Sequence, residues 1–167
     1  MKTLFIIRHA KSSWDGSNVD DFERPLSERG KRDAPRMGKR FKEKEIHPDQ
    51  MVSSPAKRAF STAKKIAKVL KFSKENVKTD RRLYHADEET ILTVVRELKD
   101  SRKVVMIFGH NPGLTEFVNS LMDGQQDIDN IPTCGVVAFQ FNTETWTDVN
   151  WGKGKMLFFD YPKSKED

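Results

Sequence analysis

LFIIRHAKSS, residues 4–13, joins an apolar run to an Arg–His pair almost at the start of the chain. Residues 3–7 are rich in β-branched and aromatic side chains, which is typical of a buried strand. Arg8 and His9 follow at once. Either this pair marks the point where the strand leaves the core for solvent, or the strand delivers both side chains to a functional site. The rest of the sequence is needed to choose between these two interpretations of Arg8 and His9.

The bulk composition predicts one soluble domain spanning residues 1–167, because this length supports one core and leaves little room for a second. The hydrophobic fraction is 36% and the mean hydropathy is −0.71. No apolar run approaches the ~18 residues that span a membrane, and no signal-peptide pattern precedes the first strand. The single cysteine, Cys134, excludes an internal disulfide and fits a reducing compartment. We therefore expect a cytoplasmic protein that does not contact the membrane.

The net charge of +5 is unevenly distributed along the chain. Residues 28–74 contain 15 Lys or Arg against 5 Asp or Glu, so the remainder of the chain is net acidic. Such a basic block indicates an anionic partner, or else it forms the solvated faces of two helices. It lacks the interleaved aromatic residues that stack on bases, which argues against nucleic acid.

Apolar runs and helix signals alternate along the chain. Four helices are predicted, each from a capping residue followed by apolar positions at helical spacing. Their expected starts are Ser27, Ser54 with Pro55, Asp87 or Glu88, and Asn111 with Pro112. The predicted strands are residues 3–7, 50–53, a short segment within 77–83, 103–109, 135–141 and 156–161.

This alternation predicts an α/β layer fold with a mostly parallel sheet. No helix signal separates the last two strands, so they are expected to form a hairpin with at least one antiparallel strand. In sheets of this kind, ligands bind beyond the carboxyl ends of the strands.

Several polar side chains occur where the predicted strands end. Arg8 and His9 follow the first strand, His110 follows 103–109, and Arg58 lies just after 50–53. Parallel strands would bring all four to one edge, where potential cations repel unless an anion joins them. A metal is a poor explanation, because arginines oppose a cation and no carboxylate or cysteine has ligand spacing. A phosphoryl group suits the set, since arginine offers a fork of donors to its oxygens.

These segments resemble the histidine phosphatase superfamily in its phosphoglycerate-mutase-like branch. RHA (8–10) corresponds to the opening Arg-His-Gly motif of the family, SSPAKRAFSTA (53–63) to its Ser-x-x-x-Arg-Ala-x-x-Thr-Ala segment, and VVMIFGHNPGL (104–114) to its late strand–histidine motif. RPLSERG (24–30) and the short length make the chain most similar to the SixA-type phosphohistidine phosphatases. The resemblance implies a three-layer fold, with helices on both faces of the sheet.

The resemblance also implies roles for the four strand-end residues. His9 would be the nucleophile and carry a phosphohistidine intermediate, while Arg8, Arg58 and His110 would form the phosphate pocket. Water would then hydrolyse the intermediate, so the resemblance implies no metal and no organic cofactor.

Four further residues are candidates for binding phosphate or substrate: Lys11, Ser13, His85 and Asn111. The alternative for Lys11 and Ser13 is that they only turn the chain away from the pocket. Asn111 begins a helix whose positive dipole end would point at the phosphate.

The chain departs from the family pattern in three places. Ala10 replaces the family glycine, and Asp15 stands where a phosphate-contacting Asn is frequent. A carboxylate would repel phosphate, so Asp15 is not assigned to the pocket. The general-acid glutamate is also missing, and RLYHADEE (82–89) occupies its region. His85 or Asp87 could replace it, or His85 is an ordinary loop residue.

The absence of the general-acid glutamate affects which class of substrate is expected. A leaving alkoxide needs a strong proton donor, whereas the leaving imidazole of a phosphohistidine can be protonated beforehand. We therefore predict a phosphatase whose partner is a phosphorylated protein, or a small phosphorylated compound. The alternatives are a broad phosphomonoesterase or mutase-like enzyme for small metabolites, and a non-catalytic module that binds phosphate or nucleic acid through the basic block.

Overall fold

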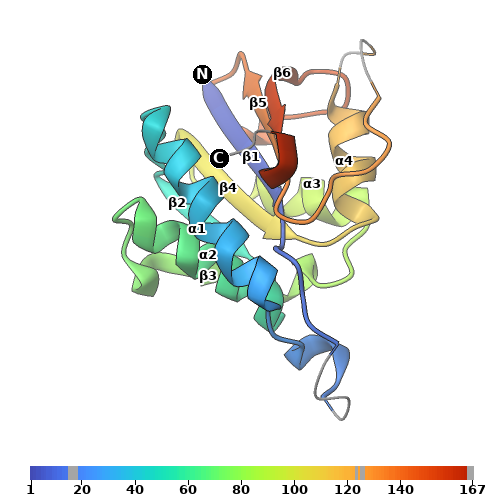
Figure 1. The fold of residues 1–167 in the computed structure, drawn as a ribbon. Helices are drawn as coiled ribbons and strands as arrows, with labels where there is room; N and C mark the ends of the chain where they lie inside the picture. Colours follow the sequence, from blue (N-terminus) through green and yellow to red (C-terminus); the bar gives the residue numbers. More distant parts are fainter. Residues whose placement is uncertain (15–18, 123, 125–126, 165–167) are drawn as a thin grey trace.

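The computed structural model describes residues 1–14, 19–122, 124 and 127–164 of the chain. A six-stranded sheet forms its centre, in the order β3-β2-β4-β1-β5-β6 (Figure 1). The strands in chain order are β1 (Lys2–Arg8), β2 (Gln50–Ser53), β3 (Val77–Thr79), β4 (Val104–Gly109), β5 (Val136–Phe141) and β6 (Lys155–Asp160).

The sheet is parallel except around β5, which runs antiparallel to both β1 and β6. This confirms the mostly parallel sheet and the final hairpin. The short strand predicted within residues 77–83 is β3, and a 3-10 helix, η3 (Arg81–Leu83), follows it. The Asp80 side chain accepts a hydrogen bond from the Arg82 backbone and turns the chain there.

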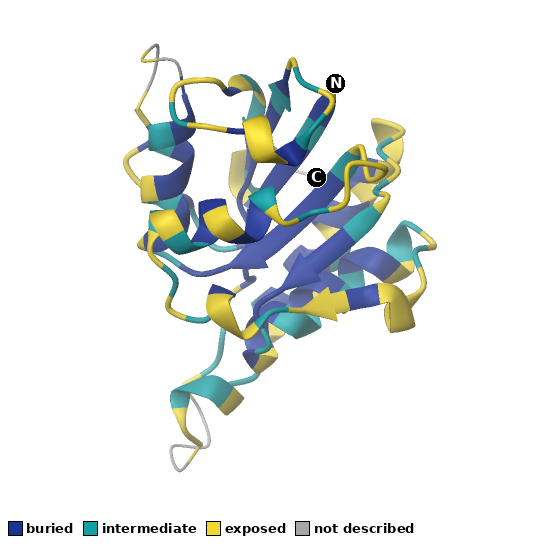
Figure 2. Cartoon of the chain, turned by 180° about the vertical axis from the view of Figure 1, so that it is seen from behind, coloured by how far each residue is buried: buried dark blue, intermediate teal, exposed yellow. Residues whose placement is uncertain are grey.

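Helices cover both faces of the sheet, so the fold has three layers (Figures 1 and 2). α1 and α2 pack against one face, and α3 and α4 against the other. The helices are α1 (Glu28–Glu43), α2 (Lys57–Val69), α3 (Glu88–Arg96) and α4 (Gly113–Leu121).

The central strand β1 shows why the apolar run in the sequence is continuous. Leu4 and Ile6 belong to the core under α3 and α4, whereas Phe5 and Ile7 belong to the core under α1 and α2. Successive side chains of a strand point to opposite faces, and both faces of this sheet are covered. Every position of β1 from Leu4 to Ile7 is therefore buried, as the dark central strands of Figure 2 show.

Two of the predicted helix starts are confirmed. The Ser27 side chain accepts a hydrogen bond from the Gly30 backbone at the start of α1, and Asp87 accepts one from Thr90 at the start of α3. Each side chain satisfies one of the free N–H groups in a first helical turn. Pro35 lies inside α1, which continues through it.

The other two helix starts are displaced along the chain. Ser54 does not cap α2: Ala56 occupies the N-cap position, and Pro55 precedes the helix. The Ser54 hydroxyl is instead 2.8 Å from Nε2 of His110. α4 begins at Gly113, after Pro112.

Across the described residues, no helix is both long and apolar enough to cross a membrane.

Gly30 holds the first turn of α1 against the chain that leaves β1. A Cβ atom added at Gly30 would lie 2.1 Å from the carbonyl oxygen of Lys11. That same oxygen accepts a hydrogen bond from the Ser27 backbone at 2.9 Å. Close packing at a position without a side chain therefore fixes the segment that follows His9.

We expect Gly30→Ala to destabilise the protein, although alanine favours a helix by roughly 1 kcal/mol over glycine. Overpacking against backbone costs about 1–3 kcal/mol, and this contact cannot relax by a side-chain rotation. Urea unfolding measures the change, with the exposed neighbour Lys31→Ala as control. A Gly30→Ala protein as stable as the Lys31→Ala protein would contradict this account of the packing.

Candidate active site

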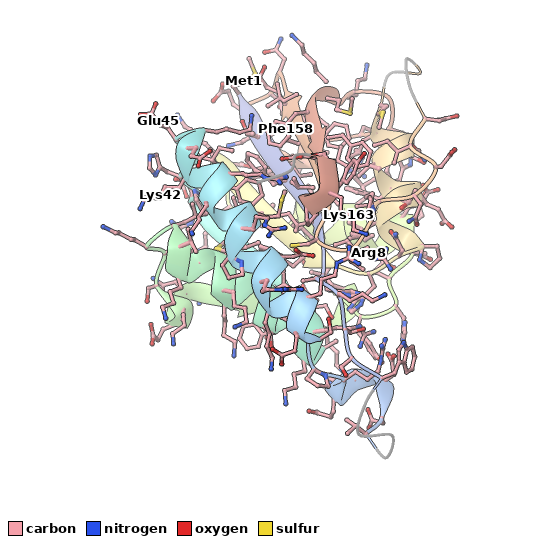
Figure 3. All side chains as sticks on the ribbon, in the orientation of Figure 1. Met1, Arg8, Lys42, Glu45, Phe158 and Lys163 are labelled. Carbon is pink, nitrogen blue, oxygen red and sulfur yellow. The ribbon has the colours of Figure 1, made fainter. Side chains whose placement is uncertain are left out.

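The four strand-end residues meet at one cavity. Arg8, His9, Arg58 and His110 line a hollow of about 260 Å³ at the carboxyl ends of the parallel strands. Figure 3 places Arg8 at the end of β1 remote from Met1, whereas Lys42 and Glu45 lie beside the opposite end of the strand. Further lining residues are Lys11, Ser12, Trp14, Arg24, His85, Asn111 and Thr133.

The His9 ring is held in one tautomer by the chain that follows it. Nδ1 lies 2.7 Å from the carbonyl oxygen of Ala10, and a carbonyl can only accept, so Nδ1 carries the proton. Nε2 of neutral His9 therefore has the free lone pair. Burial, together with the nearby Arg58 and Arg8, lowers the pKa of His9 to about 4.

The His110 ring lies beside that of His9, with 5.2 Å between the ring centroids. Its Nε2 is 2.8 Å from the Ser54 hydroxyl, which also accepts a hydrogen bond from the Ala56 backbone. Burial lowers the pKa of His110 to about 3, with the neighbouring His9 as the next cause. Both histidines are thus neutral near pH 7.

Arg8 and Arg58 supply part of the positive charge of the cavity, which Arg24 and Lys11 also line. Arg8 donates from Nη1 to the carbonyl oxygen of Ile131 at 2.9 Å. Burial and the nearby Arg58 lower the pKa of Arg8, which stays a cation because an arginine has so high a starting pKa. Arg58 is 4% exposed and is oriented by Asp21, to whose backbone oxygen and carboxylate it donates at 2.6 and 3.0 Å.

Asp21 joins several groups around the cavity, a role that the sequence did not suggest. Its carboxylate accepts hydrogen bonds from Tyr84, Arg58 and Arg24, at 2.6, 3.0 and 3.1 Å. The hydrogen bonds from Tyr84 and Arg58 hold the pKa of Asp21 well below its usual range. Asp21 therefore stays ionised and balances part of the arginine charge.

Arg24 is a second cavity residue that sequence reasoning did not assign. It donates to the Ser12 hydroxyl at 2.7 Å, and its guanidinium lies 3.7 Å from the centre of the Trp14 ring. The available signal was its place in RPLSERG, the segment that supported the resemblance. The motif alone did not predict what Arg24 does, because the partners of Arg24 precede the motif in the chain.

The additional candidates divide into two groups. Lys11, His85 and Asn111 line the cavity, and their role in binding phosphate stays a prediction. Among the described residues that line it, Ser13 and Asp87 are not found. The Ser13 backbone instead donates to the carbonyl oxygen of Pro25 at 2.8 Å.

Asp87 lies away from the cavity, at the start of α3. Asp87 is exposed and caps α3, and its hydrogen bonds with Thr90 lower its pKa. Asp15 lies outside the described residues.

His85 approaches the cavity from the loop before α3. Its backbone has φ +59°, an uncommon conformation for a residue with a side chain. The ring lies 4.0 Å from that of Tyr84 and 6.3 Å from that of His110, measured between centroids. Nε2 is 3.8 Å from the Asp21 carboxylate, and two thirds of the side chain is exposed. His85 therefore stands at the mouth of the cavity.

Together these groups suit a compact, multiply charged anion. Arginine cations and the Lys11 ammonium can bind its oxygens, while a neutral imidazole with a free lone pair stands among them. A histidine in this setting can attack an electrophilic centre that the cations hold.

A family model described as the histidine phosphatase superfamily (branch 1) matches residues 4–90. Among proteins of similar sequence, an uncharacterized chloroplastic protein of Arabidopsis thaliana is 27% identical over 156 residues. These residues are 89% of this chain and 70% of that protein. Phosphoglycerate mutase 1 of Saccharomyces cerevisiae is 35% identical over 65 residues, which cover 38% of this chain and 26% of the mutase.

Solved structures share the fold over nearly the whole chain. The protein histidine phosphatase SixA, complexed with tungstate, has a TM-score of 0.82 and 18% identity, covering 97% of this chain and 98% of its own. A putative SixA from Agrobacterium tumefaciens has a TM-score of 0.75 and 20% identity, covering 96% and 98%. A mycobacterial glucosyl-3-phosphoglycerate phosphatase has a TM-score of 0.71 and 15% identity, covering 96% and 100%.

These matches confirm the phosphoglycerate-mutase-like fold that the motifs implied. The family model covers more than half of the chain and includes the segments around His9 and Arg58. The chain belongs to the histidine phosphatase superfamily, branch 1.

Proposed function

We propose that the protein is a phosphatase that forms a phosphohistidine intermediate on His9 and acts on protein phosphohistidine. One observation carries the proposal: the hydrogen bond from Nδ1 of His9 to the Ala10 carbonyl leaves the lone pair on Nε2, in a cavity that is also lined by Arg8, Arg58 and His110. Membership of the superfamily and the fold shared with SixA support it.

The first step transfers the phosphoryl group to His9. The Nε2 lone pair attacks phosphorus, and the bond from phosphorus to the leaving nitrogen breaks as the new P–N bond forms. Arg8 and Arg58 bind the equatorial oxygens and stabilise their charge. The leaving imidazole departs as a neutral group, because its other ring nitrogen is protonated before the P–N bond breaks and the electron pair of that bond returns to the nitrogen that carried phosphorus.

The second step releases phosphate. With phosphorus on Nε2 and a proton on Nδ1, the phosphorylated His9 ring is cationic, and the Ala10 carbonyl stabilises that proton. A cationic imidazole is a good leaving group. Water attacks phosphorus, the P–N bond breaks, and its electron pair returns to Nε2, which regenerates neutral His9.

His9→Ala is expected to abolish formation of an acid-labile, base-stable phosphoprotein, because it removes the attacking nitrogen. Arg58→Ala is expected to slow turnover by about 10²–10³, the scale for loss of one preorganised donor. Rapid quenching after mixing with phosphohistidine measures both. His47→Ala is the control, since His47 is exposed and lies at an apolar groove away from the cavity. Wild-type protein that turns over substrate without a trapped phosphoryl group would contradict the covalent mechanism.

The pKa of His9, about 4, predicts how the protein responds to acid. In the unfolded chain a histidine titrates near about 6.5, so below that pH the unfolded state binds more protons than the folded state. The free energy of unfolding should therefore be constant above pH ~6.5 and fall as the pH drops toward 4. Histidine NMR titration, with His9→Asn to assign the signal, should place its midpoint well below 6.5. A midpoint at the ordinary value would contradict the neutral nucleophile.

A second candidate function rests on His85, the ring at the cavity mouth. If His85 protonates a leaving alkoxide, the protein is a broader phosphomonoesterase for small metabolites.

A series of substrates separates the two functions. For the second, His85→Gln should slow alkyl and sugar phosphates by about 10²–10⁴, the usual contribution of a general acid, and leave p-nitrophenyl phosphate nearly unchanged, because that leaving group needs no proton. For protein phosphohistidine, wild-type turnover should exceed that of every sugar phosphate, and His85→Gln should affect all substrates alike. Steady-state kinetics at constant pH give both comparisons.

A further inference from the structure

The outer side of α2 carries a group of lysines that the active site does not use. α2 contains no Asp or Glu, and its lysines recur along one side of the helix. Ser61, Lys64, Lys65 and Lys68, together with Lys74 beyond the helix, line a surface hollow of about 310 Å³. We refer to Lys64, Lys65, Lys68 and Lys74 as the α2 lysine face.

These four ammonium groups have no ion-pair partner among the described residues. The cations of the neighbouring α1 behave differently: Arg29 and Arg36 pair with Asp33. The Lys64 ammonium group lies over the Phe60 ring, 4.4 Å from its centroid. Like charges gathered in a hollow repel one another, so the site favours an anion.

The α2 lysine face is connected to the active site through the helix itself. Arg58 lies in the first turn of α2 and lines the catalytic cavity. Ser61, Lys65 and Lys68 follow it at spacings of three, seven and ten residues, which keep side chains on one side of a helix. With a rise of 1.5 Å per residue, Lys64 lies about 9 Å and Lys68 about 15 Å along the axis from Arg58.

We propose that the α2 lysine face is the docking surface for an acidic segment of the phosphorylated protein substrate. The inference rests on the proposed function, because the segment belongs to the molecule that carries the phosphohistidine. An extended chain advances about 3.3 Å per residue, so the acidic side chains should lie roughly three to five residues from the phosphohistidine.

Charge complementarity favours an acidic protein segment over nucleic acid. Base recognition without sequence preference needs aromatic rings on which bases stack. None of the described residues that line the hollow is aromatic. Phe60, beneath Lys64, is half-buried and packs against the core under α1 and α2.

Synthetic peptides with one phosphohistidine test the proposal. The acidic peptides carry three Glu residues at positions three to five on one side of the phosphohistidine, either N-terminal or C-terminal to it, and the reference peptide has Gln there. Wild-type protein should show a kcat/KM at least about tenfold higher for one acidic peptide than for the reference, and added salt should remove the difference, since exposed charges are screened.

The variant Lys64→Glu/Lys65→Glu/Lys68→Glu should lose this preference and keep its activity on free phosphohistidine. The matched control is Lys99→Glu/Lys153→Glu/Lys155→Glu, which changes the net charge equally with exposed lysines elsewhere. It should keep the preference. The comparison separates a local docking surface from attraction by the overall charge of the protein.

The outcomes distinguish this inference from the proposed function. If free phosphohistidine is turned over but no acidic peptide is preferred, or if both triple variants lose the preference equally, the docking surface is wrong and the proposed function stands. If no phosphohistidine compound is turned over, the proposed function fails. If single-stranded DNA binds wild-type protein more tightly than the acidic peptides do, and the α2 variant loses that binding, the face binds nucleic acid and the inference is overturned.

Discussion

The parallel pairing of β1, β4 and β2 is the constraint on which the site depends. Its register aligns Arg8 with Gly109 and Ser53 with Phe108, so the residues that follow each strand emerge at the same edge. The apolar side chains of these strands are buried on both faces and set that register, because a slip of one residue would turn every side chain to the other face. The histidines are thereby held by the core of the protein rather than by mobile loops.

Charge balance around the cavity follows from this convergence. Two buried histidines beside two arginines stay neutral, since burial and the neighbouring cations disfavour further positive charge. Asp21 compensates the arginines from outside and orients Arg58, while leaving the nucleophile uncharged. A cavity built in this way is electrostatically suited to an anion and still presents a free lone pair. Chemistry at His9 and anion binding are therefore two consequences of the same electrostatic arrangement.

The main features of the fold, and the convergence of Arg8, His9, Arg58 and His110 at one cavity, could be predicted from the sequence, because both depend on local signals. Buried strands are continuous apolar runs, and polar residues directly after them lie at the sheet edge. Asp21 could not be predicted in the same way. Its partners Arg58 and Tyr84 are 37 and 63 residues away, and no local pattern encodes such a contact. The role of Ser54 was mispredicted for a related reason, because its position before a helix suggested a cap and its actual partner, His110, follows a different strand, β4.

α2 contacts the segment after β1, contributes Arg58 to the cavity and carries the α2 lysine face. Thr62 accepts a hydrogen bond from the Ala10 backbone at 2.9 Å and donates one to the Arg58 carbonyl at 2.8 Å. The helix thus anchors the chain that orients His9, and its first turn carries an arginine of the phosphate pocket. Because the inner side of α2 is packed in the core, the backbone positions that carry the outer lysines are fixed relative to His9. A ligand bound to these lysines would lie at a set distance, along a rigid helix, from the proposed nucleophile His9. Discrimination between protein substrates requires such a fixed distance.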